Sequence, residues 1–184
     1  FLSSNKYSGD VNFDIKVPID CRIDSSNVSG DVKISNLKAD IDTSTVSGDN
    51  IVQSSYGKLN IATVSGNISL TDHKGNIEAS CVSGDALLSN IVGSMKAESV
   101  SGNVILKNAK LSNLTAETVS GDVVFSGEFS EKAEVSMATV SGAVAINIQG
   151  DFGIEYNFSS FSGDISINLP NKEITKSKNL RGSY

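Results

Sequence analysis

The sequence predicts an all-β fold, a single parallel β-solenoid, from three observations: a near-constant repeat, alternating apolar residues within it, and a glycine at each expected corner. A Ser-Gly pair, usually followed by Asp or Asn, recurs nine times at steps of 18 to 21 residues. A repeat of this length cannot bury its apolar face alone, so neighbouring repeats must stack. The pairs begin at Ser8, Ser29, Ser47, Ser65, Ser83, Ser101, Ser120, Ser141 and Ser162.

We expect residues 1–184 to form one solenoid domain of about nine coils. The coils within residues 31–102 have a regular length of 18 residues, whereas the coils in 10–30 and 103–184 are longer. Parallel strands stacked at ~4.8 Å would give a rod on the order of 40 Å long. We expect right-handed winding, because parallel β crossovers are nearly always right-handed.

The residues that follow each glycine form the first expected strand. Apolar residues occupy the second and fourth positions with polar or small residues between them, which is typical of a half-buried strand. Asn50 departs from this pattern and indicates a local bulge or a tolerated polar insertion. The second positions are Val11, Val32, Asn50, Ile68, Ala86, Val104, Val123, Val144 and Ile165; the fourth are Phe13, Ile34, Val52, Leu70, Leu88, Leu106, Phe125, Ile146 and Ile167.

A second expected strand precedes each following glycine. The residues seven and five positions before that glycine are mostly apolar or small, so both columns are assigned to the core. The first column comprises Ile23, Ile41, Leu59, Ile77, Met95, Leu114, Val135 and Tyr156; the second comprises Ser25, Thr43, Ile61, Ala79, Ala97, Ala116, Met137 and Phe158.

A third column, two residues before each glycine, is also assigned to the interior. This column lies three residues after the column five before glycine, so the alternation of inward and outward residues must be interrupted between them, which predicts a bend. The Ser-Gly-Asp sequence favours a corner there. If this column instead faced solvent, the rod would carry an apolar stripe of the kind that marks a partner surface. Its members are Val28, Val46, Val64, Val82, Val100, Val119, Val140 and Phe161.

The position after glycine forms an acidic column with few interruptions. Stacked carboxylates repel each other unless they are solvated, screened or bridged by a cation. We interpret them as solvated corner residues in Asx-type turns. A calcium ladder is the alternative, although calcium rolls need Gly-Gly-x-Gly-x-Asp twice per coil. The column comprises Asp10, Asp31, Asp49, Asn67, Asp85, Asn103, Asp122, Ala143 and Asp164.

Hydroxyl residues form a further ladder in the recurring Thr-x-Ser. With the intervening valine pointing inward, these hydroxyls would lie on an exposed stripe, as in ice-binding solenoids. We favour small residues at a tight corner, because Cys81 and Asn27 interrupt the array. The pairs are Thr45/Ser47, Thr63/Ser65, Ser99/Ser101, Thr118/Ser120 and Thr139/Ser141.

Composition argues against several classes of partner. The net charge of −6 and the presence of only two arginines argue against nucleic acids and anionic membranes. No apolar run approaches the ~20 residues that span a bilayer, and a signal or anchor ahead of Phe1 is compatible with the sequence. Cys21 and Cys81 lie about three coils apart, roughly 14 Å along the axis, and are expected to be buried free thiols.

No residue pattern marks a catalytic, cofactor or metal site. His73, the single histidine, lies in Thr-Asp-His-Lys-Gly and is predicted to be a solvated loop residue. Arg22 and Arg181 lie at opposite ends, so they do not form the mixed acidic and basic cleft of a polysaccharide-active β-helix enzyme. We therefore expect no enzymatic activity and no cofactor, with such an enzyme as the alternative.

Aromatic residues gather in the longer C-terminal coils, where larger side chains are expected to fill a wider core. Phe129 and Phe152 lie outside the predicted core columns, which makes them candidates for exposure, as on a carbohydrate platform. Pro18 and Pro170 fall in the longer outer coils, where edges or bulges tolerate proline.

The repeated Val-Ser-Gly-Asp-Val-x-Ile/Leu, as at residues 28–34, resembles a widespread bacterial family of unknown function that is labelled adhesin. Thr-Val-Ser-Gly-Asn/Asp at residues 63–67 and 118–122 is similar to the same family. The resemblance covers Ser8 to about Leu169. It implies a β-solenoid attached or exported to the bacterial envelope, and it supplies no catalytic residues.

We expect a non-enzymatic binding, adhesion or scaffolding module of the bacterial cell envelope or extracellular space. Its partner would be an envelope component, a surface glycan or a protein, contacted along a repetitive face. End-to-end self-association is a further expectation, because solenoid ends expose unpaired strand edges. The sequence singles out no ligand-binding residue.

Overall fold

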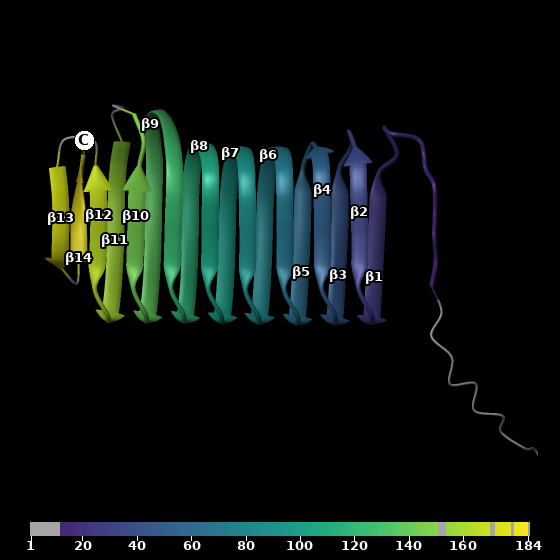
Figure 1. The fold of residues 1–184 in the computed structure, drawn as a ribbon, viewed down its shortest axis with the longest axis horizontal. Coiled ribbons are helices and arrows are strands. Elements are labelled where there is room, and N and C mark those ends of the chain that lie inside the picture. The colour runs from purple at the N-terminus through teal and green to yellow at the C-terminus, as the bar shows by residue number, and fades with distance from the viewer. Residues whose placement is uncertain (1–11, 151–153, 170–171, 178, 184) are drawn as a thin grey trace, which may run out of the picture.

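The computed structural model describes residues 12–150, 154–169, 172–177 and 179–183, which contain fourteen strands and no helix. All fourteen strands belong to one sheet that winds into a rod, with successive coils side by side along its long axis (Figure 1). The strands are β1 (Ile23–Ser29), β2 (Val32–Leu37), β3 (Ile41–Ser47), β4 (Asn50–Tyr56), β5 (Leu59–Ser65), β6 (Ile68–Ser83), β7 (Ala86–Ser101), β8 (Val104–Ser120), β9 (Val123–Ser141), β10 (Val144–Ile148), β11 (Ile154–Ser162), β12 (Ile165–Leu169), β13 (Lys172–Ser177) and β14 (Asn179–Ser183).

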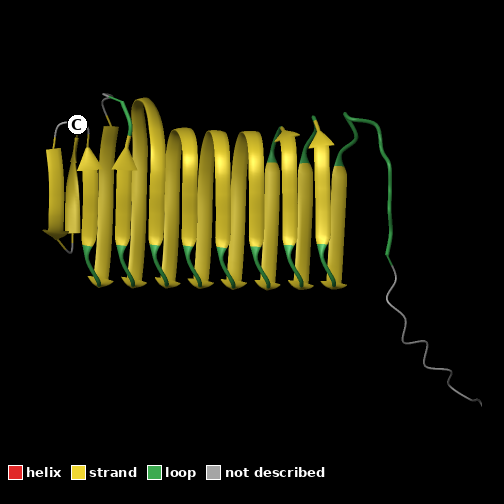
Figure 2. Ribbon diagram, in the orientation of Figure 1, coloured by secondary structure: helices red, strands yellow, loops and turns green. Residues whose placement is uncertain are grey.

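Each coil contributes two strand segments, which form two rows. β1, β3 and β5 belong to one row, β2 and β4 to the other, and pairing joins residues one coil apart, such as Ile41 and Leu59. In each of β6 to β9 a single long strand supplies both segments: the first half of β6 pairs with β4 and its second half with β5. Figure 2 shows this course repeated along the rod. The predicted parallel β-solenoid is confirmed, with about eight turns.

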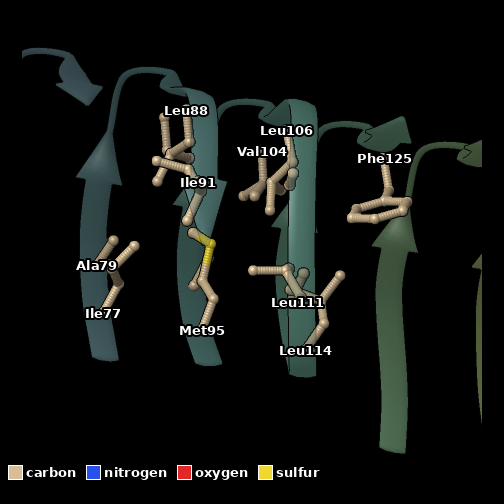
Figure 3. Packing of buried hydrophobic residues seen from close by; sticks show 14 of the residues in the cluster. Ile77, Ala79, Leu88, Ile91, Met95, Val104, Leu106, Leu111, Leu114 and Phe125 are labelled. Carbon is tan, nitrogen blue, oxygen red and sulfur yellow. The ribbon is translucent and has the colours of Figure 1, made fainter. Parts of the chain in front are cut away.

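The core is built from four of the predicted columns: the second and fourth residues after each corner glycine, and the seventh and fifth residues before the next one. Through the middle of the rod these residues are buried, and their side chains stack in register, as Ile77 does on Met95 and Met95 on Leu114. Figure 3 shows side chains of successive strands in this shared interior. Fully burying one such side chain contributes roughly 1.5–3 kcal/mol, so stability is spread over many similar rungs.

Asn50 is a tolerated polar insertion in this core, and no bulge forms at it. Its side chain is fully buried, accepts a hydrogen bond from Thr43 Oγ1 at 3.1 Å and donates to the carbonyl oxygen of Ala62 at 2.9 Å. These bonds replace the water that the amide loses, which removes most of the cost of its burial.

Each coil turns at recurring positions with positive φ. At the Ser-Gly corner, Gly84 has a φ of 135°, and a Cβ on it would overlap the carbonyl group of Gly66 in the preceding coil. A second glycine column occurs at Gly57, Gly75 and Gly93. A further corner uses non-glycine residues with φ of 51–59°, most of them Asn or Asp, which tolerate this region best: Asn36, Ser54, Asp72, Asn90 and Asn108.

The two ends of the rod differ. At the C-terminal end, β13 and β14 pair antiparallel with β12 and β11, so that two reversed strands follow the parallel stack. At the other end, residues 12–20 form no strand, and Phe13 is 82% exposed. The prediction that Phe13 lies in the core is wrong, because the first of the nine expected coils does not stack on β2. Val11 lies outside the described residues.

The longer coils are accommodated by register shifts. β8 and β9 slip relative to each other between Lys107 and Ala109, and again between Leu111 and Asn113. Phe129 is completely buried there and stacks on Phe125 with ring centroids 4.4 Å apart. The expected exposure of Phe129 is therefore wrong. Phe125 and Phe158 fill the core as expected, whereas Phe161 is exposed. Phe152 and Pro170 lie outside the described residues.

Candidate functional site

The column two residues before each corner glycine faces solvent, which corrects the inward assignment. Its six middle members, Val46 to Val140, are each 47–50% exposed, and the terminal members Val28 and Phe161 are 74% and 80% exposed. Equivalent residues stack at ~4.8 Å, so the column runs along the rod for roughly 34 Å. We call it the valine stripe: Val28, Val46, Val64, Val82, Val100, Val119, Val140 and Phe161.

A bend before the Ser-Gly corner turns the stripe outward. Pairing between β3 and β5 is continuous from Ile41 to Thr45, omits Val46, and resumes at Ser47. The alternation of inward and outward residues is interrupted at this point: Thr45 is 3% exposed, whereas Val46 and Ser47 are both exposed. The predicted bend is present, but its inner side is occupied by threonine.

In four coils a hydroxyl group donates to a backbone carbonyl on the inside of this bend, whereas Thr45 Oγ1 and Ser99 Oγ have no hydrogen-bond partner. Thr118 Oγ1 donates to the carbonyl oxygen of Gly102 at 3.1 Å, and Thr139 Oγ1 donates to that of Gly121 at 3.0 Å. The threonines are buried, so they do not form the exposed hydroxyl stripe that an inward valine would have produced. A hydroxyl suits this position because a buried carbonyl without a donor is costly.

A groove of about 1260 Å³ runs beside the stripe, along residues from Asn27 to Ser162. Its floor is the column of hydroxyl residues, and its second wall is the outward column two residues before the stripe. We call the stripe, the floor and this wall the valine groove. The volume of the groove exceeds the ~300–1,000 Å³ of small-molecule pockets, and its shape suits an elongated macromolecular surface. The wall residues are Ser44, Ala62, Ser80, Glu98, Glu117, Ala138 and Ser159.

The groove carries charge at two neighbouring rungs of its wall. Glu98 and Glu117 are exposed and lie opposite each other in the register of β7 and β8. Lys96 Nζ lies 2.8 Å from Glu98 Oε1, and this hydrogen bond raises the pKa of Lys96. The other wall residues are serine or alanine, so the groove is apolar with one acidic patch.

The residue after each corner glycine joins neighbouring coils. Asp85 Oδ1 accepts the backbone N–H of Asn103 at 2.8 Å, and Asn67 Oδ1 accepts that of Asp85 at 3.0 Å. The same contact recurs along the rod, so the column is a ladder between coils and not a set of local Asx turns. Within the described residues, no group of three or more His, Cys, Asp or Glu side chains could hold a metal ion.

His73 is buried in the core, which corrects its prediction as a solvated loop residue. It belongs to an inward column with Ser55 and Ile91, in the row opposite the valine groove. Its Nδ1 lies 2.7 Å from Ser55 Oγ, whereas its Nε2 has no hydrogen-bond partner. Burial lowers the pKa of His73, so the neutral ring is the native form.

The remaining candidate residues lie apart from one another. Cys21 and Cys81 are free thiols, as predicted, but Cys21 is only half-buried, which corrects its predicted burial. Cys81 is buried in the floor of the groove, 3.3 Å from the carbonyl oxygen of Gly84, and this burial raises the pKa of its thiol. Arg22 precedes β1 and Arg181 lies in β14, at opposite ends of the rod. In the part of the chain that the structure describes, no helix is long and apolar enough to span a bilayer.

Two features of the fold were missed from the sequence, although both leave a signal. The residue before each stripe valine is Thr, Ser, Cys or Asn, a small polar residue suited to the inside of a bend. The corner with positive φ leaves Asn or Asp at spacings of 18 residues or a multiple of 18, the same period as the glycines of these coils: Asn36, Asp72, Asn90 and Asn108.

Fold and surface together define a solenoid repeat protein with an elongated apolar groove. The chain belongs to the Toastrack family of unknown function, whose model (Toastrack DUF4097) matches residues 2–128 and 92–183. These two overlapping matches cover nearly the whole chain. Neither the curated proteins nor the solved structures contain a match. Family membership supports the solenoid fold and assigns neither an adhesin activity nor a ligand.

Proposed function

We propose that this chain is a non-enzymatic binding or scaffolding module of the bacterial envelope, with the valine groove as its contact surface. The observation that carries the proposal is the uniform half-exposure of six valines on successive coils. Folding does not require apolar residues at these positions, because hydroxyl residues occupy the inside of the bend. Contiguous apolar patches above ~300–600 Å² mark interaction sites.

The solenoid presents this surface in a preorganised form. Backbone hydrogen bonds such as Gly84 N–H to the Ser101 carbonyl, 3.0 Å long, join each coil to the next and hold the rungs at a constant spacing. A partner therefore orders few groups of the rod when it binds. Each valine adds a small apolar area, so binding depends on several rungs acting together. The envelope location rests on the family resemblance of the Val-Ser-Gly-Asp repeat.

A polysaccharide-active enzyme is the alternative, and Glu98 with Glu117 is the carboxylate pair that it would use. Glycosidases place two such groups ~5–10 Å apart and keep one of them protonated. Glu98 is exposed and forms an ion pair with Lys96, 2.8 Å away, whereas a glycosidase general acid is typically set in an apolar pocket. Release of reducing ends from a wall glycan that Glu98→Gln abolishes would favour the enzyme.

The test is retention of the purified chain on isolated bacterial wall, membrane and glycan fractions, with and without a chelator. The double variant Val82→Asp/Val100→Asp should lose retention on the fraction that holds the unchanged chain. Leu87→Asp/Val92→Asp is the matched control, because these residues are 45% and 41% exposed and lie outside the groove. Equal retention of both variants, or no retention of the unchanged chain, would overturn the proposal. Loss on chelation would point to the acidic column instead.

A further inference from the structure

The length, charges and small residues of the valine groove together indicate what covers it. We propose that the groove is covered by a second copy of this chain, packed antiparallel so that the two valine stripes face each other along their whole length. The inference rests on the proposed function, because it names the partner of the same groove.

The size of the stripe suits a dimer interface. A half-exposed valine presents roughly 75 Å² of surface, so the eight rungs expose on the order of 600 Å² before the flanking wall is counted. A stable interface of standard size takes about 800 Å² from each partner. A short peptide or small ligand would leave most of the rungs uncovered, whereas a second rod has the same length and the same rung spacing.

A two-fold axis can relate two facing rods in two ways. In the antiparallel arrangement the axis crosses the rods between the fourth and fifth rungs, so Val82 faces Val100 of the second copy. In the parallel arrangement the axis runs along the rods. Each stripe then either faces the same rungs of the other stripe, with the two walls on opposite flanks, or is displaced sideways onto the opposite wall. Both arrangements are closed and self-complementary, so the side chains must select between them.

The charges of the groove favour the antiparallel arrangement. There, Glu98 lies opposite Ser80 and Glu117 opposite Ala62, so each long acidic side chain meets a small residue of the other copy. In the parallel arrangement that is displaced onto the wall, Glu98 would instead lie against Val100. Burying the Glu98–Lys96 ion pair against apolar groups carries a desolvation penalty.

The ends of the stripe fit the same arrangement. Val28 and Phe161 are the most exposed members, at 74% and 80%, and they belong to the first and last rungs. Antiparallel packing places Phe161 of each copy over Val28 of the other. The largest side chain of the stripe then covers the rung that no preceding described strand protects.

The oligomeric state is the first test, measured by sedimentation equilibrium from about 1 to 100 μM. We expect a dimer that Val82→Asp/Val100→Asp converts to monomer, each charged rung weakening association by more than about tenfold. Leu87→Asp/Val92→Asp should leave the dimer unchanged. Circular dichroism confirms that the variants are folded. A dimer that both double variants leave intact overturns the inference.

Cysteine cross-linking tests the orientation in a background of Cys21→Ser and Cys81→Thr, threonine being the common residue of that column. Val46→Cys and Val140→Cys chains, mixed and oxidised, should form a disulfide between the two kinds of chain. Neither should cross-link alone, because two copies of either site lie roughly 24 Å apart along the antiparallel rods. Efficient cross-linking of Val46→Cys with itself overturns the antiparallel arrangement.

The inference and the proposed function can fail separately. A chain that is monomeric at every concentration overturns the second copy as occupant. If that monomer still binds an envelope fraction, and Val82→Asp/Val100→Asp abolishes the binding, the groove serves a different partner and the proposed function stands. If the chain dimerises through the stripe but binds no fraction, the inference holds and the envelope-binding role fails.

Discussion

Two columns of the same repeat motif behave in opposite ways in the folded rod. Gly84 lies against the backbone of Gly66 so closely that a Cβ would overlap it, whereas Val82, two residues earlier, is 47% exposed. Glycine recurs because the stacked backbone leaves no room for a side chain. Valine recurs although packing does not demand it. The contrast separates the part of the motif that builds the rod from the part that forms its surface.

The largest effect on stability should follow from adding a side chain to the column of corner glycines. Gly84→Ala places a Cβ into the Gly66 carbonyl and holds alanine at a φ of 135°, so we expect a loss of at least about 3 kcal/mol in the free energy of unfolding. Urea unfolding followed by circular dichroism measures this loss.

Gly30→Ala is the matched control for steric overlap. Gly30 also has positive φ, 110°, but the nearest atom to its added Cβ is Asn27 Nδ2 at 3.5 Å, an ordinary contact. Only the backbone strain of about 1–2 kcal/mol should remain. Equal losses for the two alanine variants would show that φ alone, and not coil stacking, makes glycine necessary.

The buried His73 should make the stability of the rod depend on pH. Because burial lowers the pKa of His73 below its ordinary value of 6.5, the unfolded chain binds a proton that the native chain resists. Stability from the neutral ring is therefore complete above about pH 6.5 and declines as the pH falls toward the native pKa. Unfolding measured from pH 7.5 to 4.5 should show this decline.

The double variant Ser55→Ala/His73→Leu isolates this effect from that of the carboxylates. It removes both hydrogen-bonding groups, and leucine resembles Ile91, which follows His73 in the same column. Its stability should fall less steeply with acid than that of the unchanged chain. Parallel pH profiles for the two proteins would mean that His73 protonates without opening the core.

The sequence was sufficient for the solenoid, its period and most of its core, because those depend on columns that repeat in every coil. It was not sufficient for the direction of the valine stripe. At a break in alternation either neighbour can point inward, and an apolar residue such as Val82 is normally assigned there. The deciding contact, a hydroxyl to the glycine carbonyl of the preceding coil, joins residues 15 to 18 positions apart.

Two single residues were misjudged for related reasons. His73 has polar neighbours in the sequence, but its spacing of 18 residues from Ile91 places it in an inward column. Phe129 pairs with the buried Leu111, 18 residues earlier, in a part of the coil for which no core column was predicted. Local composition misled in the first case, and an inward position missing from the predicted repeat did so in the second.

A smaller effect should come from the ladder beside the corner glycine. Asp85→Ala removes the oxygen that accepts the N–H of Asn103 at 2.8 Å, which should lower the free energy of unfolding by about 1 kcal/mol. Asp85→Asn should be nearly neutral, because Asn67 already fills the same role in the preceding coil. A loss in Asp85→Asn equal to that in Asp85→Ala would show that the negative charge is required.

The smallest effect on stability should come from a substitution in the valine stripe itself. Val82→Asp places the new carboxylate in water, so the free energy of unfolding should change by less than about 0.5 kcal/mol. Ala79→Asp introduces the same group in the same coil at an inward position only 4% exposed, where it should cost several kcal/mol through desolvation. The unfolding of both variants is measured at a concentration where the chain is monomeric, so that the loss of an interface is not mistaken for a loss of folding stability. A large destabilisation by Val82→Asp would restore the valines to the core and remove the groove as a contact surface.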